Sequence, residues 1–212
     1  MALRIVGVCI FSALTACNKQ PQSPSISQTE QAQKTSLQET LILKDDFSQR
    51  KSNWQVINGQ WSFEKGILKQ SGTKEAYPEI LYKNLAIADV KVAVSFTPIS
   101  GNIDASGGII FRAKDEDNYY IVRANALEDN FRLYTFIDGR RHLLKSATVK
   151  PPSFAKAHSI RIIAVGNHIQ AYLNDKLKID ITDDTFKKGI TGLWTKEDSV
   201  TTFDDFRVYS LK

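Results

Sequence analysis

The chain has 212 residues, of which 42% are hydrophobic and 24% charged, and its formal net charge is +5. These values are ordinary for one soluble globular domain with additional segments. No dense cluster of lysine and arginine is present, so the sequence does not predict a nucleic-acid partner, and no apolar run is long enough for a permanent membrane-spanning helix.

The first segment, residues 1–17, has the layout of a secretory signal, because Arg4 precedes a short apolar block and small residues follow. It ends in LTAC, which resembles the lipobox of bacterial lipoproteins. In that family the cysteine is diacylated and becomes the first mature residue. Cys9 would leave with the signal, so Cys17 would be the only mature cysteine and no disulfide is expected. The alternative is an ordinary signal peptide in which Cys17 is accidental.

Residues 18–40 contain no aromatic residue and are dominated by Gln, Ser, Thr and Pro. Such a composition cannot bury enough apolar surface to fold. We therefore expect a disordered tether between a lipid anchor at Cys17 and a globular domain at residues 41–212. This organisation predicts a lipid-anchored protein of the cell envelope. Asn18 fits the pattern for sorting to the outer membrane if the source is Gram-negative.

From residue 41 onward, short runs of alternating apolar and polar residues are separated by turn signals such as Asn58-Gly59 and Lys65-Gly66. Many short strands at this spacing are typical of an all-β sandwich or barrel. No stretch has a convincing helical period. The predicted fold is two packed antiparallel sheets, each with an apolar inner face and a polar outer face.

The stretch GGIIFRAKDEDNYYIVR places two arginines in strands that otherwise consist of core-forming residues. A turn at 115–118 would pair Arg112 with Ile121 and Ile110 with Arg123. Directly opposed residues share a face of the sheet. Both arginines are therefore expected on the outer face, behind the core.

A second turn, at 127–130, would pair Arg123 with Tyr134 and Asn125 with Arg132. Three adjacent strands would then carry polar and aromatic side chains on one outer surface. That predicted surface consists of Arg112, Arg123, Asn125, Arg132 and Tyr134.

Four pieces of the chain resemble a known family. They are DDFS…NWQVINGQWSFEKGIL, SGGIIFRAKDEDNYYIVR, HIQAYLNDKLKID and GITGLWTKEDSVTTFDDFRV, and they run from near Asp46 to Leu211. They resemble the concanavalin A-like (laminin G/jelly-roll) domains of bacterial secreted proteins, nearest the branch of 3-keto-disaccharide hydrolase-like domains. The resemblance implies a jelly roll whose first and last strands pair, with glycans as the usual ligands of the concave sheet. It does not imply one activity.

The predicted ligand-binding residues are Arg112, Arg123, Tyr134, Trp194 and Lys196. Arginine side chains can hydrogen-bond sugar hydroxyls, and aromatic rings stack on the apolar faces of pyranoses. In the resembled domains the region around Trp194 lies at the rim of the concave sheet. The alternative is that Trp194 belongs to the core and that the arginines only protect an exposed sheet face.

An enzymatic role has weaker support in the sequence. Glycoside hydrolysis usually needs two carboxylates facing one sugar bond, and the laminarinase-type relatives carry a Glu-x-Asp-x-(x)-Glu strand. No glutamate after residue 40 begins that pattern, and the three histidines have no metal-ligand spacing. The predicted function is non-catalytic glycan binding; the alternatives are a hydrolase or lyase acting on glycosides or keto-sugars, and a purely structural envelope protein. The glutamates concerned are Glu64, Glu75, Glu79, Glu116, Glu128 and Glu197.

Two pairs of aspartates lie in the first and last predicted strands, which the fold would place side by side. Four neighbouring carboxylates repel one another unless a cation or lysines neutralise them, and oxygen ligands suit calcium. One structural calcium ion is therefore predicted, with the alternative that these side chains point outward or bind backbone at strand ends. The residues are Asp45, Asp46, Asp204 and Asp205.

Overall fold

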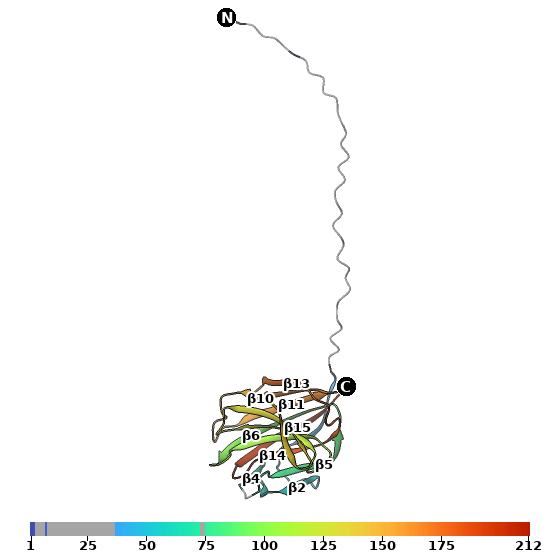
Figure 1. The fold of residues 1–212 in the computed structure, drawn as a ribbon, viewed down its shortest axis with the longest axis vertical. Coiled ribbons are helices and arrows are strands. Elements are labelled where there is room, and N and C mark those ends of the chain that lie inside the picture. The colour runs from blue at the N-terminus through green and yellow to red at the C-terminus, as the bar shows by residue number, and fades with distance from the viewer. Residues whose placement is uncertain (3–6, 8–36, 73–74) are drawn as a thin grey trace. The chain divides into compact units, whose positions relative to one another are not determined.

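The computed structural model describes residues 1–2, 7, 37–72 and 75–212. Residues Leu37–Lys212 form one compact unit (Figure 1). The lipobox, nearly all of the predicted signal and most of the predicted tether lie outside the described residues. Within the described part of the chain, no helix has the length and apolar character needed to cross a bilayer.

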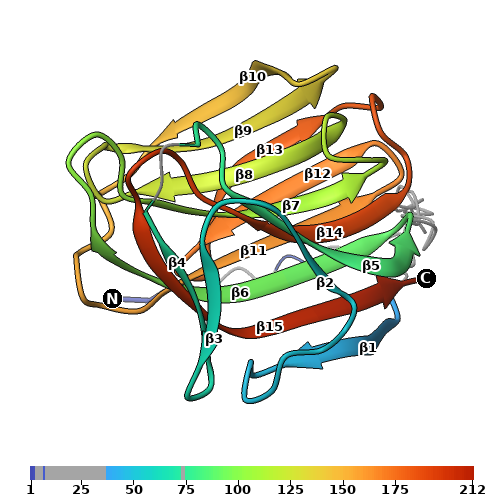
Figure 2. The same cartoon turned by 90° about the horizontal axis from the view of Figure 1, so that it is seen from below.

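Every regular element of the compact unit described here is a β-strand, and the strands form two antiparallel sheets packed as a jelly-roll sandwich, as predicted (Figure 2). Sheet A has the order β13-β12-β11-β6-β15-β4-β3, with β1 also paired to β15, and sheet B has the order β10-β9-β8-β7-β14-β5-β2. The strands of sheet A are β1 (Glu39–Asp45), β3 (Trp61–Glu64), β4 (Ile67–Ser71), β6 (Val90–Ser100), β11 (His158–Val165), β12 (His168–Leu173), β13 (Lys176–Thr182) and β15 (Val200–Leu211). Those of sheet B are β2 (Trp54–Asn58), β5 (Glu79–Ile87), β7 (Ser106–Ala113), β8 (Tyr119–Asn125), β9 (Asn130–Ile137), β10 (Arg140–Thr148) and β14 (Gly189–Trp194).

Sheet A follows the alternation that the sequence predicts. In β6 each second side chain from Val90 to Phe96 is buried, while the intervening residues are partly exposed. Side chains in a strand point alternately to the two faces, so one face of β6 enters the core and the other meets solvent.

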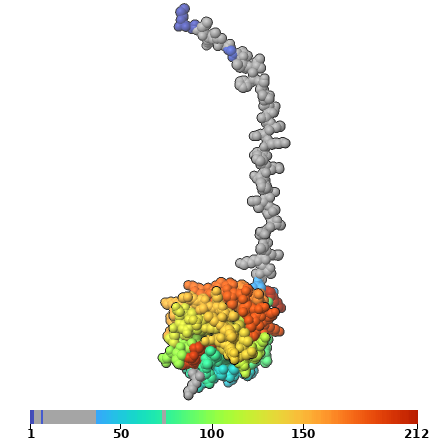
Figure 3. Space-filling model, viewed as in Figure 1, coloured from blue at the N-terminus to red at the C-terminus, as the bar shows by residue number. Residues whose placement is uncertain are grey.

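On the side of the unit shown in Figure 3, the yellow-to-orange residues that belong to β9 through β13 cover most of the surface.

Sheet B differs, because its central strands are buried on both faces. All residues of β7 and β8 are buried. Ile109 and Phe111 enter the core between the sheets, whereas Ile110 and Tyr119 belong to a second apolar cluster on the outer face of sheet B. The alternation in the sequence predicts a polar outer face for this sheet. In the structure the polar side chains share that face with large aromatic rings.

The first and last strands lie side by side, as the family resemblance implies (Figure 2). Strand β1 pairs with β15 from Glu39↔Leu211 to Asp45↔Phe206. It begins at Glu39, which lies inside the range 18–40 that was predicted to be a tether. The compact domain therefore includes the end of that range.

The four aspartates near this strand pair do not converge on a cation. Asp45 is buried; its Oδ2 accepts a hydrogen bond from Trp54 Nε1 at 2.8 Å and lies 3.2 Å from Lys51 Nζ. Its other oxygen accepts a hydrogen bond from the backbone of Phe47. The Asp205 carboxylate pairs with the Arg207 guanidinium at 2.7 Å.

Asp46 accepts hydrogen bonds from both the backbone and the hydroxyl of Ser48, and Asp204 accepts one from the backbone of Asp205. Residues 37–72 and 75–212 hold no group of three or more potential protein ligands that could bind a metal ion. Asp45 and Asp205 have a lysine and an arginine as charged partners, whereas Asp46 and Asp204 accept hydrogen bonds from neutral groups, so the four aspartates do not form one metal-binding group among the described residues.

The predicted pairing between β7 and β8 differs from the structure by two residues. Ile110 lies opposite Ile121, and Gly108 lies opposite Arg123. A shift of two does not by itself change the face on which a side chain lies, because the side-chain period of a strand is two. The exceptions are Arg112, where the backbone has a positive φ, and Ala113, which strict alternation would place on the inner face. The same shift applies to β8 and β9, where Arg123 pairs with Arg132 rather than with Tyr134.

Candidate functional site

The outer face of sheet B carries a row of opposed residues that crosses the whole sheet. The row runs Asn58–Glu79–Trp194–Gly108–Arg123–Arg132–Ser146, one residue from each of β2, β5, β14, β7, β8, β9 and β10. Neighbouring strands lie about 4.8 Å apart, so Glu79 and Arg123 are separated by roughly 14 Å along the sheet. One end of the row is acidic, the other end is basic, and Trp194 lies between them.

Gly108 leaves a gap in the middle of this row. A Cβ atom built there would lie 2.7 Å from Ile121 Cδ1 and 2.7 Å from the carbonyl oxygen of Val122. Only glycine fits this position without a shift in the neighbouring strand. The absence of a side chain lets Ile121 and the backbone of Val122 lie close to Gly108.

Arg123 occupies the basic end of the row and is only 2% exposed. Its Nη2 donates a hydrogen bond to Glu128 Oε2 at 2.8 Å, while its Nε and Nη1 have no hydrogen-bond partner among residues 37–72 and 75–212. Partial burial would raise the pKa of Glu128, but the hydrogen bonds from Arg123 and Asn130 lower it overall. Arg123 therefore holds an ionised, partly exposed Glu128 at the surface.

Lys196 and Asp104 lie at the same end of sheet B. Lys196 Nζ lies 3.4 Å from Asp104 Oδ2 and 2.7 Å from Glu197 Oε1. Burial raises the pKa of Asp104, against the opposing effects of a hydrogen bond with Ser106 and the charges of Arg123 and Lys196. Both basic residues thus act electrostatically on one buried carboxyl group.

Tyr134 and Trp194 are both on the predicted face, and neither is open to solvent. The Trp194 ring is fully buried and stacks on Tyr77, with centroids 5.7 Å apart. The guanidinium of Arg141 lies over both Tyr77 and Tyr134, 5.3 Å and 4.7 Å from the ring centroids. The expectation that Trp194 itself presents a free ring face is wrong, because Tyr77 covers it.

Arg112 is not on this surface, and the prediction that it converges with Arg123 is wrong. It is 1% exposed and has a positive φ of 50°. Its guanidinium donates hydrogen bonds to the carbonyl oxygens of Ala88, Gly166 and Phe186, and it lies 3.6 Å from the Asp89 carboxylate.

Those partners belong to loops at the end of the sandwich, so Arg112 ties together segments that are distant in the sequence. Burial lowers its pKa, and the Asp89 charge opposes this. The irregular backbone also changes the alternation of β7, because Ala113, predicted on the inner face, packs in the outer cluster.

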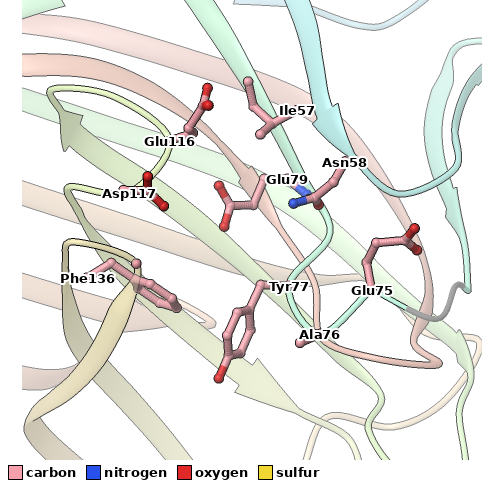
Figure 4. A pocket seen from close by; sticks show the side chains of 10 residues that line it. Ile57, Asn58, Glu75, Ala76, Tyr77, Glu79, Glu116, Asp117 and Phe136 are labelled. Carbon is pink, nitrogen blue, oxygen red and sulfur yellow. The ribbon is translucent and has the colours of Figure 1, made fainter.

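A hollow of about 390 Å³ lies at the acidic end of the row (Figure 4). Its walls come from β2, β5, the segment before β5, the β7–β8 turn and the β9–β10 hairpin. The turns meet through a hydrogen bond from the Gly139 backbone to the Asp117 carbonyl, 3.0 Å long. The lining residues are Ile57, Asn58, Glu75, Ala76, Tyr77, Glu79, Glu116, Asp117, Phe136 and Gly139.

Glu79 is the buried acid of this hollow and is 4% exposed. Its backbone N–H donates to Asn58 Oδ1 at 2.9 Å, and its Oε1 accepts a hydrogen bond from the Tyr119 hydroxyl. The second oxygen, Oε2, has no hydrogen-bond partner in the described part of the chain. In Figure 4 the carboxyl group points toward the side of the hollow where Asp117 lies.

Burial raises the pKa of Glu79 to about 8; the hydrogen bond from Tyr119 opposes the shift, and the charges of Asp117 and Glu116 add to it. Burial and the neighbouring Glu79 also raise the pKa of Tyr119. Near neutral pH the pair is therefore mainly uncharged. A carboxyl group that stays protonated in a hollow is a feature of binding and catalytic sites.

The sequence pattern predicts the same face of the sheet but does not single out Tyr77 and Glu79. A signal for Glu79 is present, since EILYKNL alternates as a strand does and alternation places Glu79 on the face opposite the buried Ile80. Tyr77 precedes the strand and carries no periodic signal. Its position depends on the loop conformation.

The comparisons with known proteins agree with this architecture. The model of the 3-keto-alpha-glucoside-1,2-lyase-like domain family matches residues 44–209. A levanase of Bacillus subtilis (strain 168) is 28% identical over 149 residues, which are 69% of this chain and 21% of the levanase. The chain therefore spans about a fifth of the length of that relative.

Two solved structures have the same fold. The carbohydrate-binding module CBM66 from Bacillus subtilis superposes with a TM-score of 0.68 at 25% identity, covering 74% of this chain and 96% of the module. A protein from Bacillus subtilis with a galectin-like fold gives a TM-score of 0.67 at 14% identity, covering 82% and 98% of the two chains. Because the family model covers most of the sequence, including both sheets and the row described above, this chain belongs to the family of 3-keto-alpha-glucoside-1,2-lyase-like domains.

Proposed function

We propose that this protein is an envelope lipoprotein whose jelly-roll domain binds a glycan on the outer face of sheet B. One sugar residue enters the hollow beside Tyr77 and Glu79. Further residues of the glycan run over Tyr77 and Arg141 toward Arg132 and Lys196. A carbohydrate ligand is supported by two similar proteins, one named a levanase and the other the carbohydrate-binding module CBM66.

The observation that carries this proposal is the composition of the hollow. Two aromatic rings, Tyr77 and Phe136, pack edge to face with centroids 5.1 Å apart, next to carboxylate and amide oxygens. Sugars present both apolar C–H faces and many hydroxyl donors, so rings beside acceptors suit them. A volume of about 390 Å³ lies within the usual range for small-ligand sites.

A chain of contacts connects the hollow with the predicted arginines. Tyr77 lies under Arg141, Arg141 lies over Tyr134, and the Tyr134 hydroxyl accepts a 3.4 Å hydrogen bond from Arg132 Nη1. Arg132 in turn lies 3.9 Å from the Glu128 carboxylate. The partly exposed members of this chain offer donors and acceptors to a glycan longer than one sugar.

A glycan array on the purified protein, followed by calorimetry on the bound glycans, tests this function. Tyr77→Ala should weaken binding by about 1–2 kcal/mol, or roughly 5- to 30-fold, because the ring contact is lost. Tyr172→Ala is the matched control, since Tyr172 lies on sheet A under Arg161 and should not affect affinity. The proposal fails if no glycan binds, or if both variants bind as tightly as the unaltered protein.

A hydrolase or lyase acting on glycosides or keto-sugars is the second candidate. Two observations favour it. Glu79 is mainly protonated and lies in the same hollow as the carboxylates of Glu116 and Asp117, and the family is described as 3-keto-alpha-glucoside-1,2-lyase-like. Such an enzyme should convert glycosides or 3-keto-glycosides into products separable by chromatography. Glu79→Gln should then abolish turnover while leaving substrate binding in place. Absence of turnover across such substrates would leave the binding function alone.

A further inference from the structure

The charge of the hollow is unbalanced. The described residues of its lining include four acidic residues and no lysine or arginine. Two of them, Glu116 and Asp117, are exposed on the β7–β8 turn, and Glu79 is buried in β5. The nearest basic group among the described contacts is the Arg141 guanidinium, which lies over the Tyr77 ring outside the lining. A neutral sugar would leave this negative potential uncompensated.

A second observation concerns the buried acid alone. Among the residues that the structure describes, Glu79 Oε2 has no hydrogen-bond partner, although Glu79 is only 4% exposed. Leaving a buried polar oxygen unsatisfied destabilises the folded protein. A donor on a ligand in the hollow would remove that cost. A charged donor would form the stronger hydrogen bond.

The aromatic walls limit where a ligand can lie. Trp194 stacks on Tyr77 and the Arg141 guanidinium lies over the same ring, while Tyr119 stacks on Phe136 with centroids 4.6 Å apart. The two rings therefore bound the hollow beside Glu79, and the carboxyl groups of the lining provide the attraction for an organic ammonium group.

We propose that the hollow holds a sugar residue with a free ammonium group, such as a 2-amino-2-deoxyhexose, with the nitrogen against Glu79 Oε2 and the ring against Tyr77. This inference rests on the proposed function for the carbohydrate nature of the ligand and adds the charge that the site selects. Asp117 and Glu116 strengthen the attraction from the β7–β8 turn. The β9–β10 hairpin closes the site at Gly139.

Binding of such a ligand should release a proton. The Glu79 carboxyl is mainly protonated at neutral pH in the free protein. An ammonium group next to it favours the carboxylate, so the proton leaves Oε2 for the solvent when the ion pair forms. The titratable groups around Glu79 are Tyr119 on β8, Asp117 and Glu116 on the β7–β8 turn, and Glu75 and Tyr77 before β5, with Arg141 on β10 beyond Tyr77.

Calorimetry with three matched probes tests the inference. Short β-linked oligosaccharides of glucosamine, N-acetylglucosamine and glucose share a ring but differ at the second carbon. At about pH 6.5, where an amine with the usual α-amino pKa is charged, the glucosamine form should bind roughly ten-fold or more tightly than the other two. Titrations in buffers with different ionisation enthalpies should show release of up to one proton per site for this form alone.

Variants connect the effect to the proposed residues. Glu79→Gln should abolish the proton release and the preference for the amine, and Asp117→Asn should reduce the preference without touching the buried core. Glu64→Gln, which removes a charge from the exposed β3 on sheet A, should change neither.

The outcomes separate this inference from the proposed function. Equal affinity for the three probes, or a preference that survives in Glu79→Gln, overturns the ammonium site. If the array finds a neutral glycan whose binding Tyr77→Ala weakens, the proposed function stands although the ammonium site fails. If neither the array nor the three probes show binding, both fail.

Discussion

Glu79 is the residue whose place in a strand, burial and shifted pKa together define the hollow. Strand alternation places it on the outer face of sheet B, and the Tyr119 hydroxyl and Asn58 fix its orientation. Its removal from water raises its pKa to about 8. An unfolded chain would return the carboxyl to its ordinary value, so the shift links folding stability to pH.

This linkage predicts the pH dependence of stability. Between the ordinary value of about 4.5 and the folded value of about 8, the native state binds more protons at Glu79 than the unfolded state does. The free energy of unfolding should therefore fall as pH rises through this window, by roughly a few kcal/mol, and level off above it. Urea unfolding from about pH 5 to about pH 9 measures the change.

Glu79→Gln is the matched variant for that measurement. It keeps the size of the side chain and an oxygen for Tyr119, but it cannot ionise. The fall in stability across this pH window should shrink in the variant. An identical pH profile in both proteins would mean that Glu79 does not titrate in the way described.

At the scale of elements, the alternation and turn signals were sufficient to predict the strands, the two sheets and the face on which Arg123 lies. The two-residue difference in register had no effect on faces, since side chains repeat every second residue. The bulge at Arg112 could not be predicted, because a positive φ at a non-glycine residue has no signature in the sequence. It depends on the carbonyl groups that three distant loops present to the guanidinium.

Arg112 therefore has a structural role that can be tested. Arg112→Ala removes the guanidinium donor from the carbonyl oxygens of Ala88, Gly166 and Phe186, and it removes the cation next to the Asp89 carboxylate. Stability should fall by about 2–4 kcal/mol in denaturant unfolding.

The control for Arg112 is Arg161→Ala on sheet A. Its ion pair with Asp175 spans 3.7 Å and the Asp175 side chain is exposed, so the loss should stay within about 1 kcal/mol. If the two variants were equally stable, the assignment of Arg112 to loop anchoring would be incorrect.

The loop before β5 shows why the site could be predicted only in part. Tyr77 covers Trp194, and the backbone N–H groups of Thr195 and Glu197 donate to the carbonyl oxygens of Pro78 and Ala76. These contacts join segments more than 100 positions apart in the sequence. Strand periodicity predicts which face a residue occupies, but it contains no information on which loop lies over that face.

At the scale of the whole molecule, the predicted lipobox and tether bear on where the domain would meet its proposed glycan ligand. A diacylated Cys17 would hold the domain at a membrane surface, next to envelope or extracellular glycans. Cys17→Ala should move the protein from the membrane fraction to the soluble fraction when cell fractions are compared by immunoblotting. Unchanged membrane association of this variant would contradict the lipoprotein assignment.

The central claim is that a glycan binds in the hollow on the outer face of sheet B, and its most direct test is an NMR titration of isotope-labelled protein with the tightest glycan from the array. The backbone signals of Tyr77, Glu79, Asp117, Phe136 and Gly139 should shift most, with smaller shifts along the row toward Arg123. Shifts confined to sheet A, around Arg161 and Tyr209 for example, would contradict the claim.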